Sequence, residues 1–160
     1  MDLFFKSVTW AGSGLVLFPL ALIISSALVL KGRKVDALLV SGGLLGAFLL
    51  VHGLKRLFAR PRPEAQDLLV AMPADFSFPS AHTAQAAAFA LACAILAGRD
   101  ASTAAGLLIW GSLGLAALLV GISRVYLQVH YISDVVAGAA LGVAWVLALN
   151  RLLKWVVSGC

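Results

Sequence analysis

Charged residues are scarce in this chain. Of its 160 residues, 12 are lysine or arginine and 7 are aspartate or glutamate, whereas 62% are hydrophobic. The mean hydropathy of +1.02 is far above that of an average soluble domain. This composition excludes an ordinary soluble globular protein. It predicts a single membrane-embedded domain over residues 1–160.

Five long stretches contain no charged residue at all. They are 7–30, 37–54, 76–98, 101–123 and 135–150. A helix needs about 20 apolar residues to cross about 30 Å of hydrocarbon, so the stretches predict about five transmembrane helices. We place these helices near 8–30, 36–57, 80–97, 102–123 and 131–154. The runs are too long and too uniformly apolar for barrel strands, so the predicted fold class is all-α, a polytopic membrane helical bundle.

The first apolar stretch has a second interpretation, a cleaved signal peptide, because Lys6 precedes it. The stretch runs to Leu30, beyond the usual length of a signal-peptide core, and the basic residues Lys31, Arg33 and Lys34 follow it. We therefore favour a retained helix.

Cysteine is also scarce, since the chain has only Cys93 and Cys160. Two distant cysteines form neither a metal-ligand spacing nor a disulfide framework, so we expect no metal and no other cofactor. The net charge of +5 and the pI near 9.7 come from residues at the predicted helix ends, without a soluble basic domain. We therefore expect the charges to set membrane orientation, and we expect no nucleic-acid partner.

Glycines recur four residues apart in two predicted helices, at Gly42 with Gly46 and at Gly138 with Gly142. This spacing lets helix backbones approach closely. Contacts within one bundle explain it more simply than a dimer interface does, and the oligomeric state stays open.

Three polar clusters interrupt the apolar sequence. They are Lys55 with Arg62-Pro63, then Pro79-Ser80-Ala81-His82, and finally Ser123-Arg124 with His130 and Asp134. The first two clusters flank the connection between the second and third predicted helices, and the last lies at the connection between the fourth and fifth. In a five-helix serpentine these two connections lie on the same side of the bilayer. The clusters are therefore expected to meet.

The remaining cations indicate which side this is. The opposite face would carry Lys31, Arg33, Lys34, Arg99, Arg151 and Lys154. Apart from the cations within the clusters, the cluster face would carry only Lys6, Arg56 and Arg60. Because cytoplasmic loops are enriched in lysine and arginine, we expect the clusters and the N-terminus on the extracytoplasmic side of a bacterial inner membrane.

His130 and Asp134 lie four residues apart at the start of the fifth predicted helix, so their side chains share one face. A carboxylate bonded to one ring nitrogen leaves the other nitrogen free to attack phosphorus, which makes His130 the candidate nucleophile. Taken alone, the pair is equally well explained as a polar cap at the membrane interface. The nearby Arg124 favours the catalytic interpretation, because its guanidinium offers paired donors to phosphate oxygens.

His82 follows Pro79 at the start of the third predicted helix. A helix N-terminus presents free N–H groups and a positive dipole end, so Ser80, Ala81 and His82 are candidates for cradling a phosphate. His82 would then protonate the departing oxygen. Ser80 is also a typical helix cap, and the two roles are compatible.

Lys55 ends the second predicted helix, and Arg62 follows within Arg60-Pro61-Arg62-Pro63. Lysine and arginine at a membrane boundary commonly extend to lipid head groups, and that explanation stays open for this cluster alone. The two prolines predict a stiff, non-helical segment able to direct Arg62 back toward the site.

Together the clusters resemble the type 2 phosphatidic acid phosphatase superfamily, whose pattern is K-x6-R-P, P-S-G-H and S-R-x5-H-x3-D. Order, spacing and residue type agree at every position but one, from Lys55 to Asp134. The resemblance implies that Lys55, Arg62 and Arg124 bind the phosphate. It also implies that His130 forms a phosphohistidine, that Asp134 supports it and that His82 is the acid.

Two features depart from the family pattern. Ala81 stands where the pattern has glycine, and its methyl group would be strained if that position required a positive φ. Members of the family commonly have six spans, and we predict five. The remaining histidine, His52, matches no family position, and we expect it to pack rather than to react.

The sequence thus predicts a metal-independent lipid phosphate phosphatase that works through a phosphohistidine. Its substrate would be a lipid phosphate such as phosphatidylglycerol phosphate, phosphatidic acid or polyprenyl diphosphate. A lipid phosphotransferase with the same site, and a non-catalytic binding protein or transporter for phosphorylated lipids, are the alternatives.

Overall fold

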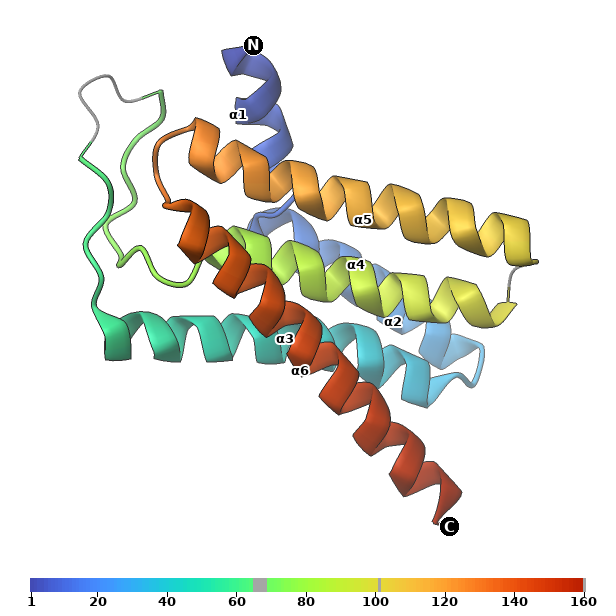
Figure 1. Ribbon diagram of the computed structural model, residues 1–160. Helices are drawn as coiled ribbons and strands as arrows, with labels where there is room; N and C mark the ends of the chain where they lie inside the picture. Colours follow the sequence, from blue (N-terminus) through green and yellow to red (C-terminus); the bar gives the residue numbers. More distant parts are fainter. Residues whose placement is uncertain (65–68, 101, 160) are drawn as a thin grey trace.

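The protein is a bundle of helices, described here from a computed structural model covering residues 1–64, 69–100 and 102–159 (Figure 1). The helices are α1 (Asp2–Trp10), α2 (Gly14–Leu30), α3 (Lys34–Phe58), α4 (Ala81–Asp100), α5 (Thr103–Tyr126) and α6 (Ile132–Ser158). No strand occurs in the described ranges. The predicted all-α fold is confirmed, and the side chain of Cys160 lies outside the described residues.

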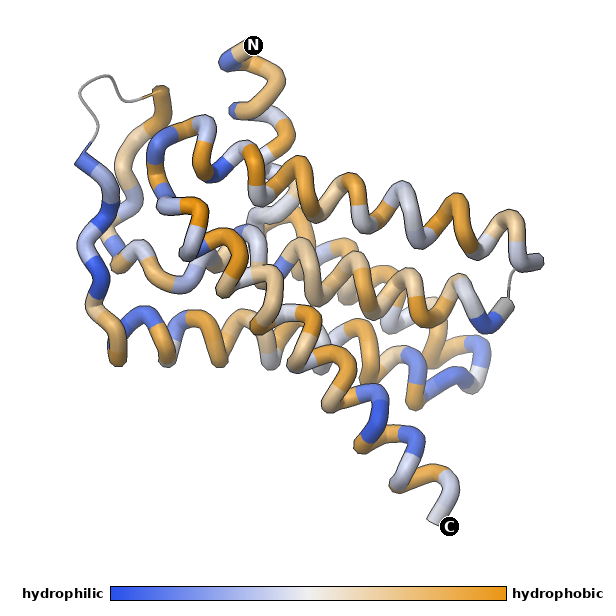
Figure 2. The backbone as a smooth tube through the Cα atoms, viewed as in Figure 1, coloured by the Kyte–Doolittle hydropathy of each residue, from blue (hydrophilic) through white to orange (hydrophobic). Residues whose placement is uncertain are grey.

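Four of these helices, α3 to α6, are long and apolar enough to cross a membrane, and α1 with α2 forms a fifth span if the bent pair is counted as one. These four agree with the helices predicted from the second to the fifth apolar stretch. Leucine, valine and tryptophan side chains remain exposed on the bundle surface, as a lipid-facing surface requires. Figure 2 shows hydrophilic residues mainly at helix ends and in the connection from α3 to α4.

The prediction of one continuous helix over 8–30 was wrong. The chain is already helical from Asp2, breaks at residues 11–13 and continues as α2 at an angle of 43° to α1. Glycine has a low helix propensity, and Gly12 and Gly14 flank Ser13, whose hydroxyl caps α2 by accepting from the N–H of Leu15 at 3.2 Å. The break lets α1 pack beside the end of α5.

Helix α4 runs through the middle of the bundle and packs against α3, α5 and α6. Its alanines, including Ala84, Ala88 and Ala92, are fully buried, and such small side chains allow close packing. Facing them, Gly138 and Gly142 of α6 approach the α4 backbone so closely that an added Cβ would lie 2.5 Å from the Ser80 carbonyl oxygen and 2.3 Å from that of Ala84. The predicted use of these glycines within the bundle is confirmed.

Candidate active site

Four helix ends meet at one end of the bundle: α3 and α5 end there, and α4 and α6 begin there (Figure 1). Ala59, with φ of 43°, ends α3 shortly before Pro61, and the chain then crosses to α4. This crossing segment is held by a bond from the Ser77 N–H to the Arg60 carbonyl at 2.9 Å. The three polar clusters therefore lie together, as the alternating direction of the predicted helices implies.

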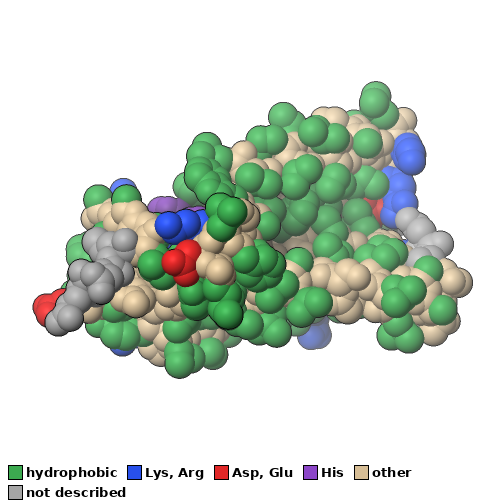
Figure 3. All heavy atoms as spheres, turned by 90° about the horizontal axis from the view of Figure 1, so that it is seen from above, with side chains coloured by type: hydrophobic (Ala, Val, Ile, Leu, Met, Phe, Trp, Pro, Cys, Tyr) green, Lys and Arg blue, Asp and Glu red, His purple; other side chains and the backbone are tan. Residues whose placement is uncertain are grey.

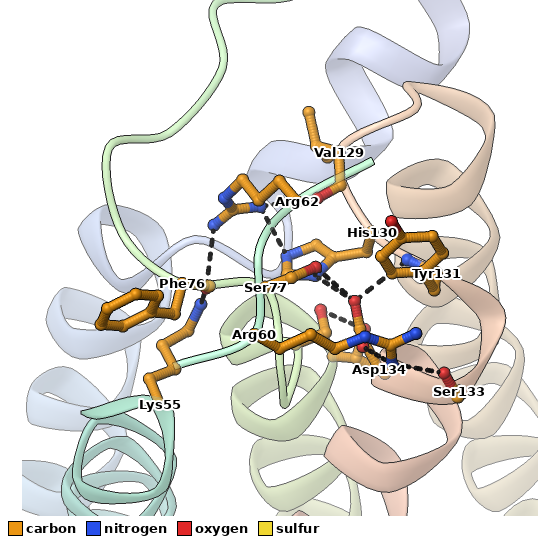
Figure 4. A network of polar contacts seen from close by, with 12 residues as sticks. Lys55, Arg60, Arg62, Phe76, Ser77, Val129, His130, Tyr131, Ser133 and Asp134 are labelled. Carbon is orange, nitrogen blue, oxygen red and sulfur yellow. Dashed lines mark hydrogen bonds and ion pairs between the residues drawn. The ribbon is translucent and has the colours of Figure 1, made fainter. Parts of the chain in front are cut away.

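The His130 and Asp134 side chains face one another across the start of α6 (Figure 4). His130 Nδ1 lies 3.3 Å from Asp134 Oδ2, and the same carboxylate oxygen accepts from the Tyr131 N–H at 3.0 Å. The Ser77 hydroxyl also donates to Asp134 Oδ2 and lies 3.4 Å from His130 Nδ1. These contacts place the proton on Nδ1 and leave the lone pair of Nε2 directed away from Asp134.

The charge state of His130 suits a nucleophile. Burial, together with the positive charges of Arg62, Arg124 and Lys55, lowers the pKa of His130 to about 3 against the opposing effect of its hydrogen bond with Asp134. Because the pKa is lowered, the ring is neutral at every pH well above 3. An imidazole with its usual pKa near 6.5 would be partly protonated at neutral pH.

Arg62 is the cation closest to the free nitrogen of His130. Its Nη1 lies 3.3 Å from His130 Nε2 and donates to the Val129 carbonyl at 2.6 Å. The neighbouring Arg60 instead binds Asp134 Oδ1 at 2.8 Å, and its guanidinium stacks 4.2 Å from the centre of the Tyr131 ring. The structure therefore separates the two arginines, with Arg62 beside Nε2 of His130 and Arg60 beside Asp134.

Lys55 reaches the same place from the last turn of α3. Its Nζ lies 2.9 Å from Asp75 Oδ2 and donates to the Phe76 carbonyl. Arg62 pairs with the other oxygen of the same carboxylate. Two of the three predicted phosphate-binding cations are therefore already bridged by the Asp75 carboxylate.

Arg124 is the third cation, in the last turn of α5, and its residue is only 5% exposed. Its Nη1 donates to the hydroxyl of Thr9 in α1 at 2.7 Å. Its Nε has no hydrogen-bond partner within the described part of the chain. A buried guanidinium with a free donor is a strong binding group for an anion.

The first turn of α4 faces this group of cations. The N–H of Ser80 donates to the Asp134 carbonyl at 3.0 Å, and the Ser80 hydroxyl lies 3.0 Å from the Thr83 hydroxyl. The N–H groups that follow, from Ala81 and His82, begin the helix, where backbone donors have no partner within the helix. Positive φ among the described non-glycine residues occurs at Ala59 and Gln128, so the anticipated backbone strain at Ala81 does not arise.

His52 lies apart from these groups. Its Nδ1 bonds the Phe48 carbonyl oxygen at 2.8 Å, and the two rings pack 4.2 Å apart on α3. The predicted packing role is confirmed. Metal-binding groups of three or more His, Cys, Asp or Glu side chains are absent from the described residues; the expectation that no metal is needed stays a prediction.

Comparison with known proteins decides the family. The model of the PAP2 superfamily matches residues 36–158, which include all three clusters. The chain belongs to the PAP2 superfamily. This finding confirms the resemblance drawn from the motifs.

Curated PAP2 relatives support the same assignment. The chain is 33% identical over 137 residues to phosphatidylglycerophosphatase B of Bacillus subtilis, covering 84% of this chain and 66% of the relative. It is 37% identical over 128 residues to decaprenylphosphoryl-5-phosphoribose phosphatase of Mycobacterium tuberculosis, covering 77% of this chain and 64% of the relative. The chain thus spans just under two thirds of the length of these relatives.

Solved PAP2 structures share the fold. The transmembrane phosphatidylglycerolphosphate phosphatase of Bacillus subtilis superposes with a TM-score of 0.83 and 30% identity, over 99% of this chain and 77% of that one. LpxE of Aquifex aeolicus superposes with a TM-score of 0.75 and 30% identity, over 94% of this chain and 85% of that one.

Sequence reasoning missed four residues of this PAP2 site. Arg60 and Ser77 bind Asp134, Asp75 binds the cations, and Thr9 binds Arg124. Asp75 carried a weak signal, as an isolated acid just before an apolar stretch. Thr9 carried none, because its partner is 115 residues away.

We predict that Thr9 positions Arg124. The Thr9→Val substitution removes the hydroxyl at nearly constant shape and should raise KM for a lipid phosphate about tenfold, because a hydrogen bond to a charged group contributes about 1.5–3 kcal/mol. Steady-state kinetics in detergent would separate this rise from a change in kcat. Thr9→Ser should restore KM, and Ser7→Ala, at an exposed hydroxyl of α1, is the matched control. Equal KM values for the Val and Ser variants would contradict the prediction.

Proposed function

We propose that this integral membrane protein is a lipid phosphate phosphatase that uses His130 as its nucleophile and needs no metal. The observation that carries the proposal is the placement of His130 between Asp134 Oδ2, 3.3 Å from Nδ1, and Arg62 Nη1, 3.3 Å from Nε2. A phosphate held by Arg62 would therefore present its phosphorus to the nitrogen that carries the lone pair.

The reaction follows from these positions in two steps. Nε2 of His130 attacks phosphorus, the bond to the lipid oxygen breaks, and His82 gives that oxygen a proton. Water then attacks the phosphohistidine, with His82 taking its proton, and inorganic phosphate is released. Lys55, Arg62, Arg124 and the first-turn N–H groups of α4 would stabilise the charge on the transferring phosphoryl group.

A lipid substrate is supported by the surroundings of the site. A groove of about 880 Å³ runs between α4, α5 and α6, and its lining is almost wholly apolar. Thr83, Tyr126 and Ile132 line the end of the groove next to the site, and Trp110 lines it further along α5. A hydrocarbon tail lying in this groove would place its phosphate head at His130. The relatives, by their names, act on phosphatidylglycerophosphate and on a decaprenylphosphoryl sugar phosphate.

The proposed activity can be tested on purified protein in detergent with chelator present. Phosphatidylglycerol phosphate, phosphatidic acid and polyprenyl diphosphate would be compared by kcat/KM, with free phosphate measured directly. We expect turnover of at least one of these lipids and inhibition by vanadate. A phosphorylated acceptor lipid without free phosphate would contradict the hydrolase, and activity lost with chelator and restored by a divalent metal would contradict metal independence.

We further infer that the site opens on the extracytoplasmic side of a bacterial inner membrane. At the opposite end of the bundle, Arg33 and Arg99 both bind Asp36, so the cations there lie beside one another. Figure 3 shows one group of Lys and Arg side chains near each end of the bundle, with mostly hydrophobic side chains on the face between them. With five spans, the cation count of the opposite end favours that end as cytoplasmic.

We predict that a reporter fused to the C-terminus will read as cytoplasmic. The end of α6 carries Arg151 and Lys154, which the positive-inside rule keeps inside. A phosphatase and fluorescent-protein reporter pair would measure the side directly. An extracytoplasmic reading would reverse the proposed orientation of the whole bundle.

A further inference from the structure

Asp75 occupies the two cations that the family pattern assigns to phosphate. One carboxylate oxygen lies 2.9 Å from Lys55 Nζ, and the other pairs with Arg62 Nη2. The backbone adds to this contact, because Arg62 Nε donates to the Asp75 carbonyl at 2.8 Å. In Figure 4 the side chains of Lys55 and Arg62 both approach the chain at Phe76. A two-oxygen anion bridging two cations is the arrangement that a phosphate would adopt there.

The burial of the three groups is unequal. The side chains of Lys55 and Arg62 are 4% and 8% exposed, whereas that of Asp75 is 46% exposed. The cations are therefore fixed inside the site, and the carboxylate reaches them from the water side. Two buried cations without an anion would be costly, so the substrate-free site gains stability from Asp75.

Asp75 is ionised while it makes these contacts. Burial by itself would raise the pKa of Asp75, but hydrogen bonds from Lys55 and Arg62 and their positive charges outweigh burial and lower the pKa. A phosphate group also carries a charge of about −1.5 to −2 at neutral pH. The two anions would repel one another strongly if both bound the same two donors.

We propose that Asp75 is an internal competitor of the substrate phosphate, which holds Lys55 and Arg62 in the empty site and turns out into water when phosphate binds. This inference rests on the proposed function of the site. It follows that Asp75 weakens binding of the phosphate head group, and that its return to the cations helps to expel inorganic phosphate after the phosphohistidine is hydrolysed.

Binding of inorganic phosphate, rather than turnover, tests this inference. Asp75→Asn and Asp75→Ala should each bind phosphate at least about tenfold more tightly than the natural protein, because the competing charge is gone. Isothermal titration of the purified proteins in detergent would measure the two dissociation constants. Phosphate should also become a stronger product inhibitor in both variants.

Asp36→Asn is the matched control, because Asp36 bridges Arg33 and Arg99 at the opposite end of the bundle and loses the same charge. Its phosphate affinity should equal that of the natural protein. Unchanged or weaker phosphate binding in both Asp75 variants would overturn the inference and make Asp75 an organiser of the cations, while lipid hydrolysis by the natural protein would still support the proposed function. Failure of every variant and the natural protein to bind phosphate would also overturn the inference, whereas only the absence of lipid phosphate turnover by the natural protein would overturn the proposed function.

Discussion

His130→Ala should abolish phosphate release from every substrate, with a loss in kcat of at least about 10³-fold. The reason is that Nε2, the atom that would bond to phosphorus, lies 3.3 Å from Arg62 Nη1 on the side of the ring away from Asp134. Removing a nucleophile that acts together with its supporting carboxylate leaves only the residual catalysis of binding and charge stabilisation. Release of inorganic phosphate from a lipid phosphate and from an aryl phosphate would measure the loss.

The matched control for this substitution is His52→Ala. His52 bonds within its own helix and packs on Phe48, so its loss should leave turnover close to that of the natural protein. Trapping the enzyme with labelled substrate, and showing that the bound label is released by acid as expected of phosphohistidine, would identify the intermediate. A His130→Ala protein that retained turnover, or that still gave a labelled phosphohistidine, would remove His130 from the mechanism.

His82→Asn should show a different pattern, which depends on the leaving group. With a lipid phosphate, whose alkoxide leaves poorly, loss of the acid should reduce kcat by about 10²- to 10⁴-fold. With p-nitrophenyl phosphate, whose phenolate leaves without a proton, the formation of the phosphohistidine should be nearly unaffected. Pre-steady-state release of nitrophenol would report this step separately from the later attack of water.

Comparing the two histidine variants distinguishes a nucleophile from an acid more clearly than either variant does alone. His130→Ala should lose activity toward both the lipid phosphate and p-nitrophenyl phosphate. His82→Asn should lose mainly the turnover of the lipid phosphate and should keep the nitrophenol burst. Equal losses of the burst and of lipid turnover in His82→Asn would show that His82 holds the site together rather than supplying a proton. The acid would then be sought elsewhere among the groups facing the phosphate.

Much of this site follows from the sequence because each polar cluster lies at a helix end. Apolar runs locate the helices, and the alternation of directions in a serpentine brings Lys55, Arg62, His82 and His130 to one end of the bundle. The pairing of His130 with Asp134 is local, since a spacing of four residues sets it. The positions of the helix ends, which hydropathy and spacing describe well, therefore determine which clusters meet, although Arg62 and His130 themselves lie just outside the helices.

Contacts that depend on irregular backbone could not be predicted in the same way. Asp75 and Ser77 belong to the segment before α4, where no periodicity fixes the direction of a side chain. Thr9 reaches Arg124 only because the chain bends at residues 11–13, whereas the apolar sequence around these small residues predicts one continuous span. Loop paths and helix breaks are set by long-range packing, which a single sequence does not display.

The close approach of α6 to α4 has a mechanical consequence. Gly138 and Gly142 of α6 pack against the α4 backbone, and the Ser80 N–H donates to the Asp134 carbonyl. This packing ties α4, which carries the proposed acid His82, to α6, which the proposed nucleophile His130 just precedes. The separation of His82 and His130 therefore depends on this helix packing rather than on the path of the long connection from α3 to α4. The proposed outward turn of the Asp75 side chain would leave this packing undisturbed, because Asp75 lies outside both helices.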